Sequence, residues 1–330
     1  MKFNKMFCSL VVVVFLMCSI PVFAQDVVTN ETAKITIGYA PFGMLETSVA
    51  KVKQFHKKYL PNVEVEWFFG LYSPHLVNNW IAGKLDISYL GDMPAIMLQD
   101  KVRNTRWVSN GVSPRGEVLA IFVNNNSTAK TLKDLEGKSL ATGIGSAQHR
   151  MIEAIMKKEN IKFNLVNQSP EVALSNLEAG KVDAFGYWPP YIEMVKYKKV
   201  GRAVMADAVK YEPEVNATWP LVVSEEFNKK NPKIVEGLVR ADIDLHKYIQ
   251  ANLDEASQIV FKELGEKIPL PVIKASLASY RYQDNIDKDA IATVQRSVDF
   301  MKSKGYIKEG FDPTAWADTS YVNKILGGKK

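Results

Sequence analysis

The residues AGKLDISYLGDMPA, numbers 82–95, contain the features that decide the fold. Gly83 is typical of a helix end, because glycine readily adopts the left-handed conformation that follows the last helical turn. Residues 85–90 are predicted to form a strand, and a further helix is expected from Pro94. The succession of helix, strand and helix is typical of a parallel α/β sheet.

The same frame recurs in the residues AGKVDA, numbers 179–184, which lead into the loop at Trp188. Each copy joins a helix-ending glycine to a strand, and each strand continues into a loop that contains Gly, Pro or aromatic residues. Gly-Lys is common at such junctions, so chance is one explanation of the repeat. The other is that the chain forms two α/β lobes built alike.

Strand and helix patterns alternate along most of the remaining chain. The period-two pattern VEVEWF at residues 63–68, for example, predicts a half-buried strand. The predicted strands are 34–39, 63–68, 85–90, 117–123, 139–142, 182–187 and 218–224, and the predicted helices are 47–59, 74–82, 94–99, 147–158, 171–179, 232–249, 253–264 and 289–304.

The composition of the 330-residue chain is that of an ordinary globular protein, with 47% hydrophobic and 24% charged residues. This excludes a disordered, collagenous or coiled-coil chain. The 42 basic residues exceed the 36 acidic ones by only six, and they form no block of like charge. Nothing in this balance indicates a nucleic-acid partner.

Residues 1–24 have the pattern of a cleaved secretory signal, with Lys2 and Lys5 before the apolar stretch 6–20 and Ala24 at the cleavage point. A membrane anchor is the alternative, but the apolar stretch is short for a span of about 20 residues. Cleavage would remove both cysteines, Cys8 and Cys18. We therefore expect an exported protein without a disulfide, a thiolate nucleophile or a cysteine metal ligand.

Five stretches together resemble the periplasmic solute-binding proteins of ABC importers in the sulfonate, nitrate and taurine group. They are residues 37–41, 82–95, 132–138, 145–149 and 182–191.

The resemblance implies a type II periplasmic binding protein, in which two α/β lobes are joined by two crossover strands near 117–123 and 218–224. Lobe 1 would comprise residues 34–120 and 222–330, and lobe 2 residues 121–221. A ligand would lie in the cleft between the lobes. The implied partners are an ABC permease and its ATPase subunits, and the protein itself is expected to be a monomer.

Two loops that join a strand to a helix, at residues 90–94 and 143–147, are candidate anion sites. The start of a helix leaves backbone N–H groups free and carries partial positive charge, so it attracts an anion. In open α/β sheets the ligand lies at the carboxyl ends of the strands, where both loops would be. Ser146 could contact the ligand or only cap its helix.

Asp92 does not suit an anion, so it either binds a ligand amine or caps the helix near Pro94. In the family, an aromatic residue at the position of Trp188 packs on the ligand. The family usually has an acidic residue where this chain has Pro189, which leaves the ligand open. For each aromatic candidate, core packing is the alternative. The candidate ligand-binding residues are Phe42, Gly43, Phe69, Gly70, Tyr72, Gly91, Asp92, Ser146, Ala147, His149, Trp188, Tyr191 and Asn216.

The sequence therefore predicts capture of a small organic anion, such as a sulfonate, taurine-like or nitrate-like ligand, by closure of the two lobes. The alternative is a small cationic or nitrogenous ligand held by Asp92, Glu46 and aromatic residues. A secreted hydrolase or a sensor protein is a further alternative. We expect no catalytic residue, cofactor or metal site, since the four histidines have no metal-ligand spacing. The related pyrimidine-synthase enzymes use a cysteine-rich motif that the mature chain would lack.

Overall fold

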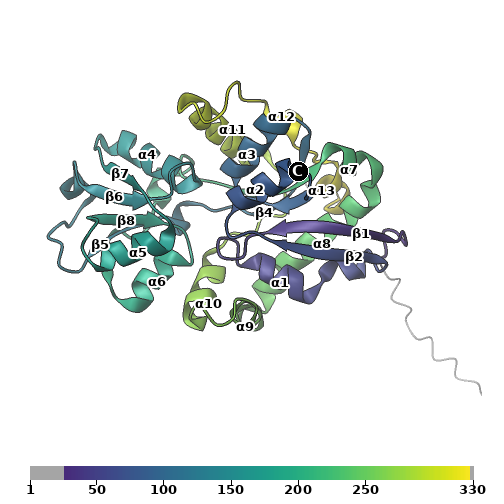
Figure 1. Cartoon of the computed structure of the whole chain (residues 1–330), viewed down its shortest axis with the longest axis horizontal. Coiled ribbons are helices and arrows are strands. Elements are labelled where there is room, and N and C mark those ends of the chain that lie inside the picture. Colours follow the sequence, from purple (N-terminus) through teal and green to yellow (C-terminus); the bar gives the residue numbers. More distant parts are fainter. Residues whose placement is uncertain (1–25, 328–330) are drawn as a thin grey trace, which may run out of the picture.

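The computed structural model describes residues 26–327, which form two α/β lobes side by side (Figure 1). The first lobe contains a sheet in the order β2-β1-β3-β10-β4, and the second a sheet in the order β7-β6-β8-β5-β9. The strands are β1 (Ala33–Tyr39), β2 (Val63–Phe69), β3 (Ile87–Tyr89), β4 (Thr105–Val112), β5 (Ala120–Asn124), β6 (Ser139–Thr142), β7 (Asn164–Asn167), β8 (Ala184–Tyr187), β9 (Gly201–Met205) and β10 (Trp219–Ser224).

The two sheets have the same topology. In the first lobe β1 pairs in parallel with β2 and β3, and β10 lies antiparallel between β3 and β4. In the second lobe β6 pairs in parallel with β7 and β8, and β5 lies antiparallel between β8 and β9. The predicted α/β class with two similar lobes is thus confirmed.

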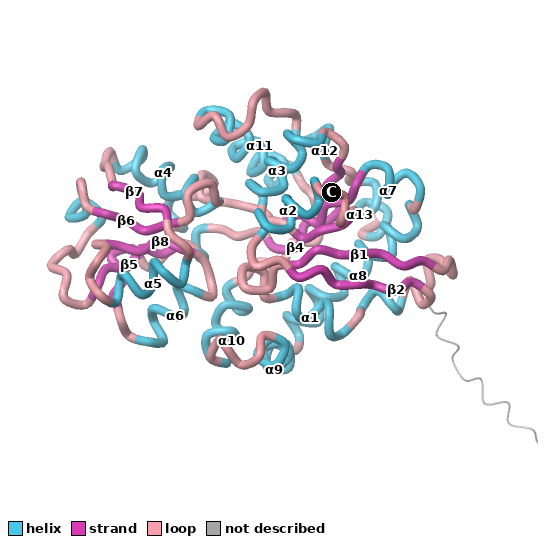
Figure 2. The backbone as a smooth tube through the Cα atoms, in the orientation of Figure 1, coloured by secondary structure: helices cyan, strands magenta, loops and turns pink. Residues whose placement is uncertain are grey.

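Helices cover both faces of each sheet (Figure 2). In β10, Leu221 and Val223 join one buried cluster while Val222 joins the cluster on the opposite face. In β5, Ile121 and Phe122 divide in the same way. Burial on both faces explains why these strands are almost wholly apolar.

The first lobe contains most of the helices: α1 (Glu46–Lys53), α2 (Ser73–Ile81), α3 (Asp92–Val102), α7 (Glu225–Lys230), α8 (Pro232–Ala251), α9 (Leu253–Glu263), α10 (Leu270–Ser279), α11 (Lys288–Ser303), α12 (Pro313–Trp316) and α13 (Ser320–Ile325). The second lobe contains α4 (Ala147–Glu159), α5 (Pro170–Glu178) and α6 (Tyr191–Lys198). Gly83 and Gly180 follow α2 and α5 with φ of 74° and 66°, as the helix-end prediction requires. The strands β4, β7 and β9 were not predicted. The longest of the helices that were not predicted are α6 and α10.

The chain passes between the sheets at residues 113–119 and again at 206–218. β10 pairs with β3 and β4 along its whole length, so the lobe boundary expected at residue 221 falls inside a strand of the first sheet. The strand expected at 117–123 starts later, at Ala120, after a short 3₁₀ turn at 116–118.

The predicted signal at residues 1–24 lies outside the described residues. Within residues 26–327, none of the helices combines the length and the apolar character needed to cross a membrane.

Candidate functional site

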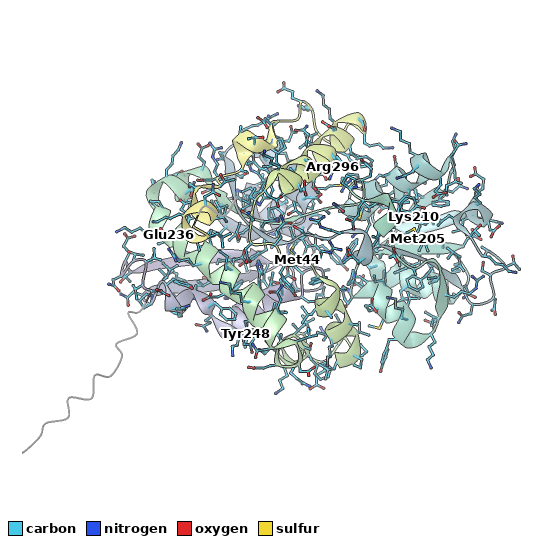
Figure 3. All side chains as sticks on the ribbon, turned by 180° about the vertical axis from the view of Figure 1, so that it is seen from behind. Met44, Met205, Lys210, Glu236, Tyr248 and Arg296 are labelled. Atoms are coloured by element: carbon cyan, nitrogen blue, oxygen red, sulfur yellow. The ribbon has the colours of Figure 1, made fainter. Side chains whose placement is uncertain are left out.

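A cavity of about 330 Å³ lies between the two lobes. Met44 forms part of its wall and sits near the middle of the molecule, where the lobes meet (Figure 3). The first lobe contributes Ala40, Gly43, Met44, Tyr72, Ser73, Pro74, Gly91, Asp92, Pro94 and Trp219, and the second contributes Gly143, Ile144, Gly145, Ser146, Ala147, Gln148, Asn167, Gln168, Ser169, Pro170 and Trp188.

A second hollow, of about 630 Å³, lies within the second lobe alone. Its lining includes Lys138 and Asp183, which precede β6 and β8 and therefore lie at the amino ends of these parallel strands. Ligands of parallel α/β sheets bind at the carboxyl ends. We therefore place the candidate site in the cavity between the lobes.

Four helices begin at the wall of this cavity, two from each lobe. Their N-cap residues are Tyr72 for α2, Gly91 for α3, Ser146 for α4 and Ser169 for α5, and all four line the cavity. The helices follow parallel strands, so their amino ends all lie at the carboxyl edges of the two sheets. The helix starts, with their free N–H groups and the positive ends of the helix dipoles, thus meet at one cavity.

The start of α4 is the part of the wall best suited to an anion. The Ser146 hydroxyl donates to the Gly143 carbonyl at 2.6 Å and accepts from the His149 N–H at 3.4 Å, so it caps the helix. Ala147 and Gln148 are the first two residues of α4, and their N–H groups have no intrahelical carbonyl to bind. These two amides, rather than the serine hydroxyl, are the donors that the loop can offer to a ligand.

Asp92 lines the cavity, but its carboxylate is engaged by the protein. One oxygen accepts from the Met93 N–H at 2.7 Å, and the other accepts from the Ser297 hydroxyl of α11 at 2.7 Å. Burial raises the pKa of Asp92, while the nearby Arg150 and these hydrogen bonds oppose that effect. Asp92 is the first residue of α3 and Gly91 is the N-cap, so the carboxylate stabilises the first turn without being the cap that the sequence suggested.

Two tryptophans face the cavity from opposite lobes. Trp188 lies over Gly43 of the first lobe, since a Cβ added to Gly43 would be 3.8 Å from its indole nitrogen. Trp219 packs edge-on against Tyr280, with ring centroids 5.1 Å apart. Together with Met44 and Ile144 they give the cavity extensive apolar walls beside the polar helix starts.

At the rim, a tyrosine and a glutamate join the two lobes. The Tyr72 hydroxyl lies 2.8 Å from both carboxylate oxygens of Glu171, and the Tyr191 hydroxyl lies 2.7 Å from one of them. Burial alone would raise the pKa of Glu171, but the hydrogen bonds from Tyr191, from backbone and from Tyr72 lower it overall. Glu171 is therefore ionised at neutral pH and accepts hydrogen bonds across the cleft.

Seven of the candidate residues meet at the cavity, namely Gly43, Tyr72, Gly91, Asp92, Ser146, Ala147 and Trp188. Six others lie elsewhere: Phe42, Phe69, Gly70, His149, Tyr191 and Asn216.

Each of these six has a local reason for its position. Phe69 is 45% exposed and packs edge-on against Phe42 at the outer edge of the sheet. Gly70 packs closely against Leu76, since a Cβ added to Gly70 would be 2.5 Å from the Leu76 side chain. The His149 side chain packs against α11, and the Tyr191 hydroxyl donates to Glu171. Asn216 is buried in the second passage between the lobes, where its backbone carbonyl accepts from Arg150. Glu46, from the cationic alternative, is buried two residues beyond Met44.

The sequence interpretation missed the contribution of the loop between β7 and α5. Asn167, Gln168 and Ser169 all line the cavity, and the Gln168 side-chain oxygen is buried without a hydrogen-bond partner. The Ser-Pro pair at 169–170 is a helix-start signal that could have identified this loop. Within the described residues, no group of three or more His, Cys, Asp or Glu side chains is arranged to hold a metal ion.

The two lobes with parallel strands on either side of a cavity define the type II periplasmic binding protein fold, as predicted. A likeness to solved structures supports this class. The chain matches the alkanesulfonate-binding protein SsuA from Xanthomonas axonopodis pv. citri, solved with MOPS bound, with a TM-score of 0.75 and 18% identity over 88% of this chain and 99% of that one. It also matches the desulfurization enzyme DszB, with a TM-score of 0.66 and 15% identity over 90% of this chain and all of that one.

Residues 29–262 match the model of the NMT1-like family, and the chain belongs to that family. A curated relative is the putative aliphatic sulfonates-binding protein of Escherichia coli strain K12, which is 24% identical over 302 residues, or 88% of this chain and 91% of the relative.

Proposed function

We propose that the protein captures a small organic sulfonate, or an anion of similar shape and charge, in the cavity between its lobes. The observation that carries this proposal is the convergence of four helix starts from both lobes on one cavity. The free amides of Ala147 and Gln148 would hold the anionic group. The apolar walls at Trp188, Trp219 and Met44 would hold an aliphatic tail, which inorganic sulfate or nitrate lacks.

The alternative of a cationic ligand has less support. The Asp92 carboxylate already accepts hydrogen bonds from Met93 and Ser297, and Glu46 is buried and does not line the cavity. Burial raises the pKa of Glu46 to about 8, so this carboxyl is mostly neutral at pH 7 and offers little charge to a cation. The four helix starts at the cavity instead contribute partial positive charge.

We propose binding without catalysis, although DszB shows that the fold also serves an enzyme. A Ser-His-Asp hydrolase would need these three side chains in mutual contact. Here Ser146 caps α4, Asp92 holds the start of α3, and the His149 side chain does not line the cavity. Each of the three groups is engaged in a structural hydrogen bond.

We further propose that the protein acts in the periplasm, as the sequence of residues 1–24 indicates, and delivers its ligand to an ABC permease driven by ATPase subunits. A ligand that contacts both lobes stabilises the closed arrangement, because only that arrangement provides all of its contacts. Taurine and nitrate remain members of the ligand class to be tested, together with longer sulfonates.

The test is calorimetric titration and thermal unfolding with methanesulfonate to hexanesulfonate, MOPS, taurine, nitrate, sulfate and simple amines. A ligand at a hundred times its Kd should stabilise the protein by about 2.7 kcal/mol. Among the alkanesulfonates, affinity should rise with chain length until the tail fills the cavity. Stabilisation by amines alone, or by none of these compounds, would refute the proposal.

Two variants sharpen this test. Trp188→Ala should weaken butanesulfonate binding about tenfold, because the tail would lose the apolar surface of the indole, and a factor of ten corresponds to about 1.4 kcal/mol of lost burial. Tyr197→Ala is the matched control, since Tyr197 is an aromatic residue on α6 with 52% of its surface exposed. Equal affinities of the two variants would remove Trp188 from the site.

A further inference from the structure

His149 connects the ligand-binding loop of the second lobe to the first lobe. Its Nδ1 accepts a hydrogen bond from the N–H of Gly145 at 3.2 Å, and Gly145 lines the cavity. Its Nε2 lies 3.1 Å from one carboxylate oxygen of Glu153, one turn along α4. The other carboxylate oxygen of Glu153 forms an ion pair of 2.6 Å with Lys304, which follows α11 in the first lobe. One chain of polar contacts thus runs from the cavity loop across the lobe boundary.

The imidazole ring also packs directly on the first lobe. It lies edge-on to Phe300 of α11, with ring centroids 5.3 Å apart, and its centroid is 6.3 Å from that of Tyr306. The His149 side chain is only 4% exposed. The ring is therefore buried between α4 of the second lobe and the end of α11 of the first.

The hydrogen bonds define the protonation state of the ring. A backbone N–H can only donate, so Nδ1 must be unprotonated to accept from Gly145, and the single ring proton must lie on Nε2, where it faces Glu153. Burial is the largest influence on the pKa of His149 and lowers it, and Lys304 lowers it as well. Glu153 acts in the opposite direction without reversing the shift. The ring is therefore neutral at pH 7.

We propose that His149 is a positioning residue, whose neutral ring holds the Gly145 loop in its ligand-binding form and couples that loop to the contact between α4 and α11. This inference rests on the proposed anion site at Ala147 and Gln148, because Gly145 lies just before them. If Nδ1 were protonated, its N–H would face the N–H of Gly145 and neither could accept, so the loop would lose this hydrogen bond. Ligand affinity should consequently fall as the pH decreases through the pKa of His149.

Two substitutions separate the hydrogen bond from the packing. His149→Phe keeps an aromatic ring against Phe300 but has no acceptor for the Gly145 N–H, so butanesulfonate should bind about tenfold more weakly. His149→Asn has an oxygen near the position of Nδ1 and cannot titrate, so binding should return to within about threefold of the wild type. Equal affinity of the Phe variant and the wild type, or an Asn variant as weak as the Phe variant, would overturn the proposal.

The pH profile tests the protonation step. A sulfonate stays ionised between pH 8 and 4.5, so changes in its affinity over this range come from the protein. The wild-type affinity should fall towards pH 4.5 more steeply than that of His149→Asn, and the difference isolates His149 from other groups. His75→Asn, which changes an exposed histidine on α2, is the matched control and should follow the wild type. Parallel profiles for the wild type and His149→Asn would overturn the role of the neutral ring.

A measurement without ligand distinguishes failure of this inference from failure of the proposed function. Amide hydrogen exchange at Gly145 should be slower in the wild type than in His149→Phe at pH 7, since only the wild type has the acceptor. A wild type that shows this protection but binds no sulfonate would refute the proposed ligand and support the contact to the loop. Equal exchange at Gly145 in the two proteins would overturn the positioning role.

Discussion

Tyr72→Phe removes one hydroxyl that joins the two lobes, and its effect can be estimated from the structure. Tyr72 precedes α2 in the first lobe, and its hydroxyl lies 2.8 Å from Glu171 of α5 in the second. Burial raises the pKa of Tyr72 to about 12, and Glu171 adds to that shift, so the phenol keeps its proton and donates. The acceptor is an ionised carboxylate. The variant therefore removes a hydrogen bond to a charged group that links the two lobes.

A hydrogen bond to a charged group contributes about 1.5–3 kcal/mol. Glu171 is exposed, so solvent screens part of this energy. Tyr191 also continues to donate to the same carboxylate in the variant. We therefore expect a loss of about 1 kcal/mol, which corresponds to about a fivefold decrease in the ratio of closed to open protein. Ligand affinity should fall by up to the same factor, because a ligand of the closed form binds in proportion to the fraction of protein that is closed.

Calorimetry with butanesulfonate measures the affinity, and small-angle X-ray scattering measures the radius of gyration with and without ligand. The unliganded variant should have a larger mean radius than the wild type, while the liganded proteins should agree. Tyr197→Phe removes a hydroxyl from an exposed tyrosine on α6 and serves as the control. An affinity of Tyr72→Phe within twofold of the wild type, with an unchanged radius, would refute the role of this contact.

Two further predictions concern stability. Glu46 ionises in the unfolded chain near pH 4.5 but in the folded protein only near pH 8, because burial raises its pKa, so the folded protein loses stability as the pH rises between these values. Glu46→Gln should raise the free energy of unfolding by on the order of 4 kcal/mol at pH 8 and by less than about 1 kcal/mol at pH 5. Urea denaturation measures this free energy, and an equal increase at both pH values would contradict the prediction. Gly116→Ala would place a Cβ 2.4 Å from the Val209 backbone nitrogen, a contact that no rotamer can relieve. Gly116→Ala should lower the free energy of unfolding by more than about 3 kcal/mol. In Gly91→Ala the new Cβ would be 3.6 Å from the Pro94 ring, so this variant should lower the free energy of unfolding by less than about 1 kcal/mol. Similar losses in the two variants would show that the backbone at Gly116 adapts.

The similar topology of the two lobes could be predicted because its signals are local. A helix-ending glycine and an apolar strand are visible in a few consecutive residues, as at Gly83 and Gly180. β4 was missed because its buried polar residues find their partners far along the chain. Ser109 donates to Asp242 of α8, and Asn110 accepts from Thr218, 108 residues away. Buried polar residues paired over such separations leave no apolar pattern in the sequence.

The loops of the site could be predicted more readily than the directions of their side chains. A loop that follows a parallel strand must lie at the carboxyl edge of the sheet, and this places Gly91 and Ser146 at the cavity. The rotation of a helix about its axis depends on packing against the other lobe. His149 is only three residues beyond Ser146, yet it faces α11. The loop at Gln168 escaped prediction because the short strand before it, β7, has a weak pattern and is only half-buried.

The first turn of α4 explains how an anion can favour closure. Ala147 and Gln148 line the cavity, while His149 packs on α11 of the first lobe. The guanidinium of Arg150 donates to the carbonyls of Glu214 and Asn216 in the second passage between the lobes. Consecutive residues of this turn therefore line the proposed ligand site and contact the opposite lobe and the connecting segment. An anion that fixes this turn also orders the contacts that hold the lobes together, so its binding energy favours the closed form.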